Sequence, residues 1–150
     1  MCIRDRKWND ASLFIDFTKD DSPRHFRFGV FSNIKHWNPK NTPWEKVPES
    51  DRPLVTHKKP AFDAGRWTHV ALTLNNVNSG KDDGAAEMFL DGKSVGKYQQ
   101  NLRLTWEPER VAIMLGIQYI GDIDDMAVFD SVLTAEQIKE ISSSELPLGK

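Results

Sequence analysis

Two aspartates at alternate positions are the part of this sequence closest to a catalytic arrangement. Asp122 and Asp124 would share one face of a strand, because successive side chains of a strand point to opposite faces. Hydrolysis of a glycosidic bond uses a pair of carboxyl groups, one as acid and one as base or nucleophile. No glutamate completes such a set beside Asp122 and Asp124. The sequence therefore predicts no catalytic residues and favours a protein that is not an enzyme.

Three tryptophans lie in polar segments where a buried position is harder to justify. Trp37, Trp44 and Trp106 are surrounded by Asn, Lys, Glu and Pro residues, and Asn38 directly follows the first of them. Exposed aromatic rings beside amides can stack on sugar rings or anchor a protein interface. Trp37, Trp44, Trp106 and Asn38 are therefore candidate ligand-binding residues. The alternative is that the rings close the ends of the core beneath a long loop, since large aromatic side chains are mostly buried.

The remaining residues exclude several other kinds of site. The four histidines never fall at the spacing of zinc ligands, and the lone Cys2 excludes an internal disulfide. No glycine-rich phosphate loop is present. Twenty basic and 22 acidic residues give a net charge of −2, which argues against duplex nucleic-acid binding. No apolar run approaches the roughly 18 residues that cross a bilayer, so direct membrane insertion is not expected.

Short strands separated by polar turns must position these residues. Apolar residues recur at strand spacing in 11–17, 25–31, 66–74, 86–90, 93–98, 111–115 and 120–129. Asp91-Gly92 has the composition of a two-residue hairpin turn between the fourth and fifth of these segments. Trp67 is expected to pack within the strand at 66–74. The pattern is typical of an all-β sandwich of antiparallel sheets.

A long loop and one helix complete the predicted organisation. Residues 32–60 contain five prolines, so we expect an ordered loop with one short strand around 54–57. Near the end of the chain, Thr134 and Gln137 have the spacing of a capping box. They predict a helix of about two turns with Ile138 and Ile141 on its apolar face.

Five short motifs then follow one another along the chain. They are Trp67-Thr68-His69-Val70-Ala71, MFLDGK at 88–93, Leu115-Gly116, GDIDDMAVF at 121–129 and LTAEQI at 133–138. In this order they resemble the laminin-G-like branch of the concanavalin A-like lectin/glucanase superfamily, over about residues 25–141. The resemblance implies a jelly roll of two antiparallel sheets with one short C-terminal helix. Hydrolases of the same superfold carry Glu-x-Asp-x-x-Glu on one strand, and this sequence has no match to it.

The resemblance also implies a structural calcium ion. Related sandwiches hold Ca²⁺ through an aspartate on the closing strand together with backbone carbonyls, which are the hard oxygen ligands that this ion prefers. Asp124, with Asp122 beside it, is the candidate metal ligand. The same side chains could instead cap a turn or pair with Arg66 or His69.

Three parts of the chain are expected from these patterns. Residues 1–10 are expected to be a non-native or disordered start, because they lack the pattern of a strand or cap and Met1–Arg6 resembles a translated sequencing-adaptor remnant. Residues 11–141 form the laminin-G-like domain, and 142–150 form a tail. The resemblance implies two further strands that this sequence does not contain, so the domain is expected to be truncated at its N-terminus.

These observations together predict a non-catalytic binding module within a larger extracellular, periplasmic or cell-surface protein. A glycan is the first ligand class, and an extracellular protein partner or a structural spacer role is the alternative. A fragment of a glycoside hydrolase is the third reading. Aromatic rings flanked by Asn and Asp would favour a sugar ligand, whereas a broad apolar surface would favour a protein partner.

Overall fold

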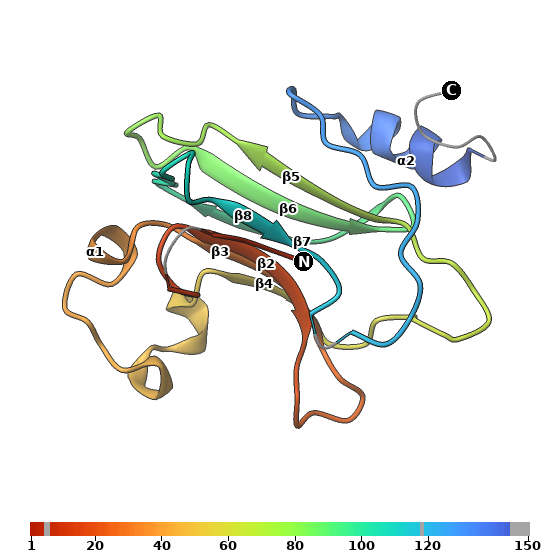
Figure 1. Ribbon diagram of the computed structural model, residues 1–150, viewed down its shortest axis with the longest axis horizontal. Coiled ribbons are helices and arrows are strands. Elements are labelled where there is room, and N and C mark those ends of the chain that lie inside the picture. Colours follow the sequence, from red (N-terminus) through yellow and green to blue (C-terminus); the bar gives the residue numbers. More distant parts are fainter. Residues whose placement is uncertain (5–6, 118, 145–150) are drawn as a thin grey trace.

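Two antiparallel sheets face each other in the computed structural model, which describes residues 1–4, 7–117 and 119–144 (Figure 1). Within these residues one sheet has five strands in the order β4-β3-β2-β1-β8, and the other has three in the order β5-β6-β7. The strands are β1 Cys2–Arg4, β2 Ser12–Phe17, β3 Phe26–Phe31, β4 Leu54–His57, β5 Val70–Asn75, β6 Gly84–Leu90, β7 Lys93–Gln100 and β8 Ala112–Met114. The predicted all-β sandwich is confirmed.

Two α-helices lie at opposite ends of the sandwich (Figure 1). The C-terminal helix α2, Ala135–Ser143, begins at the predicted capping box: the Gln137 amide donates to Thr134 Oγ1 over 3.2 Å, and the Thr134 amide donates to Gln137 Oε1 over 2.8 Å. The one-turn helix α1, Ile34–Trp37, was not predicted. Two 3₁₀ turns, Trp44–Lys46 and Glu49–Asp51, also interrupt the long loop. No described helix is long and apolar enough to span a membrane.

The core lies between the sheets, where alternate residues of the strands point inward. Its buried members from the five-stranded sheet include Leu13, Phe26, Phe28, Val30 and Val55. Ala86, Met88 and Leu90 of β6 cover them from the other sheet, and Leu102 and Leu104 close one end. The predicted hairpin joins β6 to β7, with Asp91 and Gly92 both at positive φ, as a two-residue turn of this kind requires.

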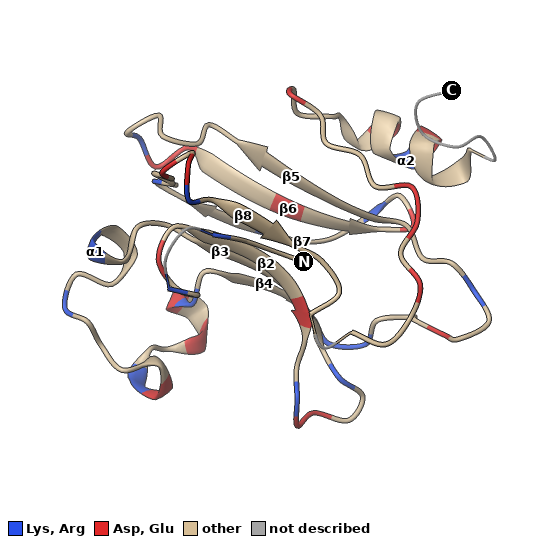
Figure 2. Cartoon of the chain, viewed as in Figure 1, with Lys and Arg blue, Asp and Glu red and all other residues tan. Residues whose placement is uncertain are grey.

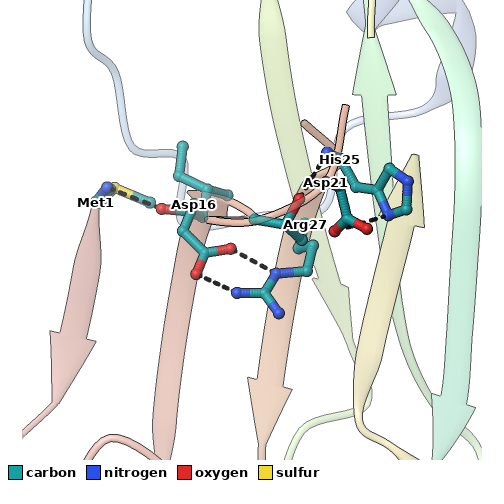
Figure 3. A network of polar contacts seen from close by, with 7 residues as sticks. Met1, Asp16, Asp21, His25 and Arg27 are labelled. Atoms are coloured by element: carbon teal, nitrogen blue, oxygen red, sulfur yellow. Dashed lines mark hydrogen bonds and ion pairs between the residues drawn. The ribbon is translucent and has the colours of Figure 1, made fainter. Parts of the chain in front are cut away.

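The outer face of the five-stranded sheet is organised by pairs across β2 and β3. Phe14 stands opposite Gly29, where an added Cβ would lie only 2.3 Å from the Phe14 ring, so the glycine makes room for it. At the next outward pair Asp16 accepts two hydrogen bonds from Arg27, of 2.8 and 2.6 Å (Figure 3). Opposite charges at directly paired positions stabilise a sheet and fix its register.

The two sheets differ in width, and this leaves part of the wider sheet uncovered. Strand β4 faces β7, since a Cβ on Gly96 would lie 2.6 Å from Val55 Cγ1. The five-stranded sheet therefore extends past β5, the last described strand of the narrower sheet, toward β1 and β8. Ile113 on β8 is accordingly 55% exposed. Both the free edge of β5 and the far strands of the wider sheet lie open on this side.

The predicted strand at 120–129 does not form. Residues 120–133 make no hydrogen bond to another described backbone group, and Asp125 has a φ of 49°, which turns the chain out of the extended conformation. Alternation of side chains is not sufficient for a strand, because its N–H and C=O groups need a neighbouring strand. The apolar side chains of this stretch are exposed, among them Ile120, Ile123, Met126, Val128 and Phe129.

Two further expectations are corrected at the start of the chain and near Trp67. Cys2–Arg4, expected to be without structure, forms β1, because it finds antiparallel partners in both β2 and β8.

Strand β5 begins only at Val70, since residues before it are held by the hairpin turn: the His69 amide donates to Asp91 Oδ1 over 3.0 Å. Trp67 is therefore 67% exposed and does not pack in the core. Of the predicted tail, residues 145–150 lie outside the described residues.

Hydrogen exchange should separate the open stretch from the core. Amides of residues 120–133 should exchange at close to the rate of an unstructured peptide, because few of them have a partner, whereas the central amides of β6 should be strongly protected. Exchange monitored by NMR or mass spectrometry measures both in one sample. Protection of 122–129 equal to that of β6 would contradict this structure and place the stretch in a sheet.

Candidate functional site

A cavity of about 650 Å³ opens beside α1 at one end of the sandwich. We call it the α1 cavity, and three separate segments form it. Its lining residues are Asn33, Lys35, His36, Asn78, Gly80, Arg103 and Thr105. Asn33, Lys35 and His36 lie at the start of α1. Asn78 and Gly80 belong to the loop between β5 and β6, and Arg103 and Thr105 to the segment that follows β7.

Two asparagines bind the backbone that forms the floor of this cavity. Asn33 donates to Thr105 Oγ1 over 2.5 Å and accepts from the Thr105 amide over 3.2 Å. Asn78 donates to the Leu104 carbonyl and accepts from the Leu104 amide, both over 2.9 Å. Together the two side chains satisfy the Thr105 N–H and both backbone groups of Leu104, in a segment that is not part of a described strand. The two clamps fix residues 102–105 between α1 and the β5–β6 loop.

Basic side chains dominate the charge of the α1 cavity. Lys35, His36 and Arg103 line it, and no carboxylate is among its lining residues. The basic residue on α1 is blue in Figure 2. His36 Nε2 lies 3.0 Å from the Asn101 carbonyl, so this nitrogen carries the proton that it donates there. The cavity thus offers cationic and hydroxyl groups to a ligand.

The predicted residues Trp37 and Trp44 belong to an aromatic cluster on the outer face of the five-stranded sheet. The cluster comprises Trp8, Phe14, Phe31, Trp37 and Trp44. The Trp37 ring lies 5.2 Å from that of Phe31, and its Nε1 donates to the Asn9 carbonyl over 2.9 Å. The Arg52 guanidinium lies 4.6 Å from the centre of the Trp44 ring. Both indoles are half-buried and already engaged, as in the packing alternative, while their role in ligand binding stays a prediction.

Asn38 and Trp106 also make contacts within the protein. The Asn38 side chain donates to the Thr42 carbonyl over 2.9 Å and accepts from the Thr42 amide over 2.8 Å, so it holds the loop after α1. Trp106 packs against the core and donates from its Nε1 to the Ala11 carbonyl. A second cavity of about 180 Å³ lies next to Trp37 and Asn38 and is also lined by Asp51. The structure therefore brings two of the four predicted residues together at this smaller cavity.

The predicted calcium ligands are not assembled into a site. Asp122 and Asp124 are exposed, and the described residues contain no group of three or more carboxylate, histidine or cysteine side chains that could hold a metal ion. Asp124 Oδ1 instead accepts from the Asp125 amide over 2.8 Å, which is a local turn contact. Backbone carbonyls would have to supply most of the six to eight oxygen ligands that Ca²⁺ takes, and calcium binding at Asp124 stays a prediction.

Burial shifts the pKa of several groups outside the α1 cavity, Tyr98 and His69 among them. Desolvation raises the pKa of Tyr98 on β7 to about 12, and the negative charge of Asp51 adds to this shift. Partial burial lowers the pKa of His69 below its ordinary value, against the opposing effect of Asp91. His69 lies just before the first residue of β5, whereas the β5–β6 loop that lines the cavity follows the last residue of that strand. The titration of His69 therefore does not act on the cavity.

Comparison with known families decides the assignment of the fold. A laminin-G-type family model, described as Concanavalin A-like lectin/glucanases superfamily, matches residues 4–139. The chain belongs to this superfamily. The assignment confirms the family inferred from the order of the sequence motifs. Domains of this superfamily often bind carbohydrate or mediate adhesion, and laminin-G-like domains are generally non-catalytic binding modules.

The comparison with solved structures adds one neighbour of this laminin-G-like domain. It is a crystal structure of residues 221–444 of an S-layer domain-containing protein from Clostridium thermocellum, with 22% sequence identity and a TM-score of 0.45. The match covers 90% of this chain and 58% of that one, so the domain spans less than two thirds of its neighbour. No curated protein matches the chain.

Sequence reasoning missed the residues that form the α1 cavity of this laminin-G-like domain. Lys35 and Arg103 stand in segments without a motif, and the two clamping asparagines are 45 positions apart. One local signal was present: Leu102 and Leu104 alternate with Arg103 and Thr105, which indicates an extended segment with one polar face. Nothing local shows that α1 and the β5–β6 loop lie on either side of it.

Fluorescence quenching should distinguish the exposed tryptophan from those of the aromatic cluster. Trp67→Phe should lower the fraction of emission that acrylamide quenches readily, because Trp67 is 67% exposed. Trp37→Phe is the matched substitution inside the cluster and should not lower that fraction, because it removes a half-buried ring. A fall caused by Trp37→Phe alone would instead show that the Trp37 ring faces solvent.

Calcium should not stabilise the chain in this arrangement. Because Asp122 and Asp124 have no third ligand side chain, excess CaCl₂ should leave the melting temperature unchanged from that in EDTA. Differential scanning fluorimetry measures both conditions. A rise that requires calcium and disappears in Asp124→Asn would contradict this and support the ligand role predicted from the sequence.

Proposed function

We propose that this domain is a non-catalytic carbohydrate-binding module of a larger secreted or cell-surface protein, and that the α1 cavity receives the sugar. The observation that carries the proposal is the cavity itself, an open depression with room for one or two sugar rings and with polar groups from three segments. Membership of a superfamily that often binds carbohydrate supports it.

The chemistry of the lining supports binding rather than hydrolysis. Glycosidases place two carboxyl groups beside the scissile bond, whereas the side chains that line the α1 cavity are amide, hydroxyl, imidazole, ammonium and guanidinium groups. The Thr105 hydroxyl accepts from Asn33 and keeps its own proton to donate to a ligand oxygen. Such groups can orient a sugar but supply no acid–base pair of carboxyls.

A glycan array tests the proposal directly. The domain should bind a subset of glycans, and Lys35→Trp, which fills the cavity from an exposed position, should abolish binding while circular dichroism stays unchanged. Ala61→Trp adds the same ring at an exposed site between β4 and β5 and should bind normally. Normal binding by Lys35→Trp together with loss in Trp37→Phe would move the site to the smaller cavity.

A second candidate function is binding of a protein partner, and the open side of the sandwich favours it. The free edge of β5 presents unpaired backbone groups, and exposed apolar side chains gather in the stretch that includes Ile120 and Val128. An extended segment of a partner could add to such an edge as a further strand. Absence of binding on the glycan array, with capture of a partner that is lost in Leu72→Pro on β5 while the circular dichroism spectrum stays unchanged, would favour this function.

A further inference from the structure

We infer that the α1 cavity recognises an acidic polysaccharide through its carboxylate or sulfate groups, an inference that rests on the proposed carbohydrate-binding function. The first observation is the sign of the charge. Lys35, His36 and Arg103 converge on one cavity whose lining contains no carboxylate. The chain as a whole carries a net charge of −2, so this basic surface is a local concentration and not a property of the whole protein.

The two fully charged side chains of the cavity are available to a ligand. Among the described residues, neither Lys35 nor Arg103 takes part in an ion pair, whereas Arg27, Arg66 and Arg110 each have a carboxylate partner. The nearby carboxylate of Asp10 accepts from the Ile34 amide over 2.8 Å and is not part of the lining. An incoming anion therefore does not have to displace an internal partner from either cation.

The backbone holds Arg103 in a fixed position. Its amide donates to Ser32 Oγ over 2.9 Å, and its carbonyl accepts from the Asn33 amide over 2.7 Å. The flanking Leu102 and Leu104 are 1% and 6% exposed, so they anchor the chain in the core and turn the Arg103 side chain outward. Ordering such a residue on a ligand costs less conformational entropy than ordering one on a free loop.

The geometry of these groups suits an acidic sugar more than a neutral one. The guanidinium of Arg103 is a planar fork that can donate two parallel hydrogen bonds to a carboxylate or sulfate, and Lys35 adds a point charge. The Thr105 hydroxyl, which lines the same cavity and accepts from Asn33, can donate to a hydroxyl of the sugar ring. The α1 cavity thus combines a contact for the sugar ring with contacts for its acidic substituent.

Two matched pairs of polymers test this inference with the intact chain. Dextran sulfate is compared with dextran, and polygalacturonate with its methyl ester, by affinity electrophoresis or isothermal titration calorimetry. Each pair differs only in the acidic group, and the two pairs distinguish sulfate from carboxylate. Binding should favour the charged member of at least one pair and weaken as salt is raised, since ionic contacts at a surface are screened.

Substitutions locate the contact. Arg103→Gln and Lys35→Gln should each weaken binding of the charged polymer by about threefold or more, because each removes one ionic contact at a partly exposed site. Lys59→Gln makes the same change of charge at a distant site. Lys59 follows the end of β4 at which His57 pairs with Phe26, and this end of the sheet is remote from α1. This control should bind like the unaltered chain, and Arg103→Lys should retain part of the affinity.

The outcomes separate the inference from the proposed function. Equal binding of the charged and neutral members of both pairs would overturn the acidic specificity and leave the carbohydrate-binding function standing. An equal loss of affinity in Lys59→Gln and Arg103→Gln would also overturn the acidic specificity of the cavity, since such a loss would reflect the net charge of the chain alone. Failure to bind any polymer, together with silence on the glycan array, would overturn both.

Discussion

The clamping of residues 102–105 is the interaction on which one end of this sandwich depends. The Asn78 side chain bonds to both the N–H and the C=O of Leu104, and the Asn33 side chain accepts from the Thr105 amide and donates to the Thr105 hydroxyl. With its backbone satisfied, the segment can bury Leu102 and Leu104 in the core at little polar cost. The same arrangement leaves Arg103 and Thr105 facing outward, so closing the core and forming the cavity have a common cause.

The aromatic cluster performs a comparable task on the outer face of the wider sheet. Phe31 is fully buried although it points away from the space between the sheets, because the long loop brings Trp37 and Trp44 over it. A proline-rich loop of this length needs such an anchor to stay ordered. The cluster explains why large aromatic residues occur in a polar segment without being exposed in full.

Local patterns in the sequence were enough to predict most strands, the Asp91-Gly92 hairpin and the capping box of α2. These features depend on residues a few positions apart, so their signals survive without knowledge of the rest of the fold. Helix α1 could not be predicted in this way, because the Ile34 amide is capped by Asp10, 24 positions earlier. The α1 cavity could not be predicted from local patterns either, since its lining residues come from three segments that are distant in the sequence. The stretch at 120–129 has strand-like residues but no strand beside it, which periodicity cannot reveal.

The unequal width of the sheets has a consequence for how the molecule behaves in concentrated solution. A strand edge without a partner among the described residues, together with exposed apolar side chains, is the kind of surface on which chains add to one another in aggregates. The opposite edge strand of the narrower sheet, β7, carries exposed charged and polar side chains, among them Lys93, Lys97 and Gln99, which oppose such addition. The resistance of the domain to aggregation therefore depends on the β5 side of the sandwich. A charged side chain in place of Ala71 or Thr73, on the outward face of β5, should increase that resistance.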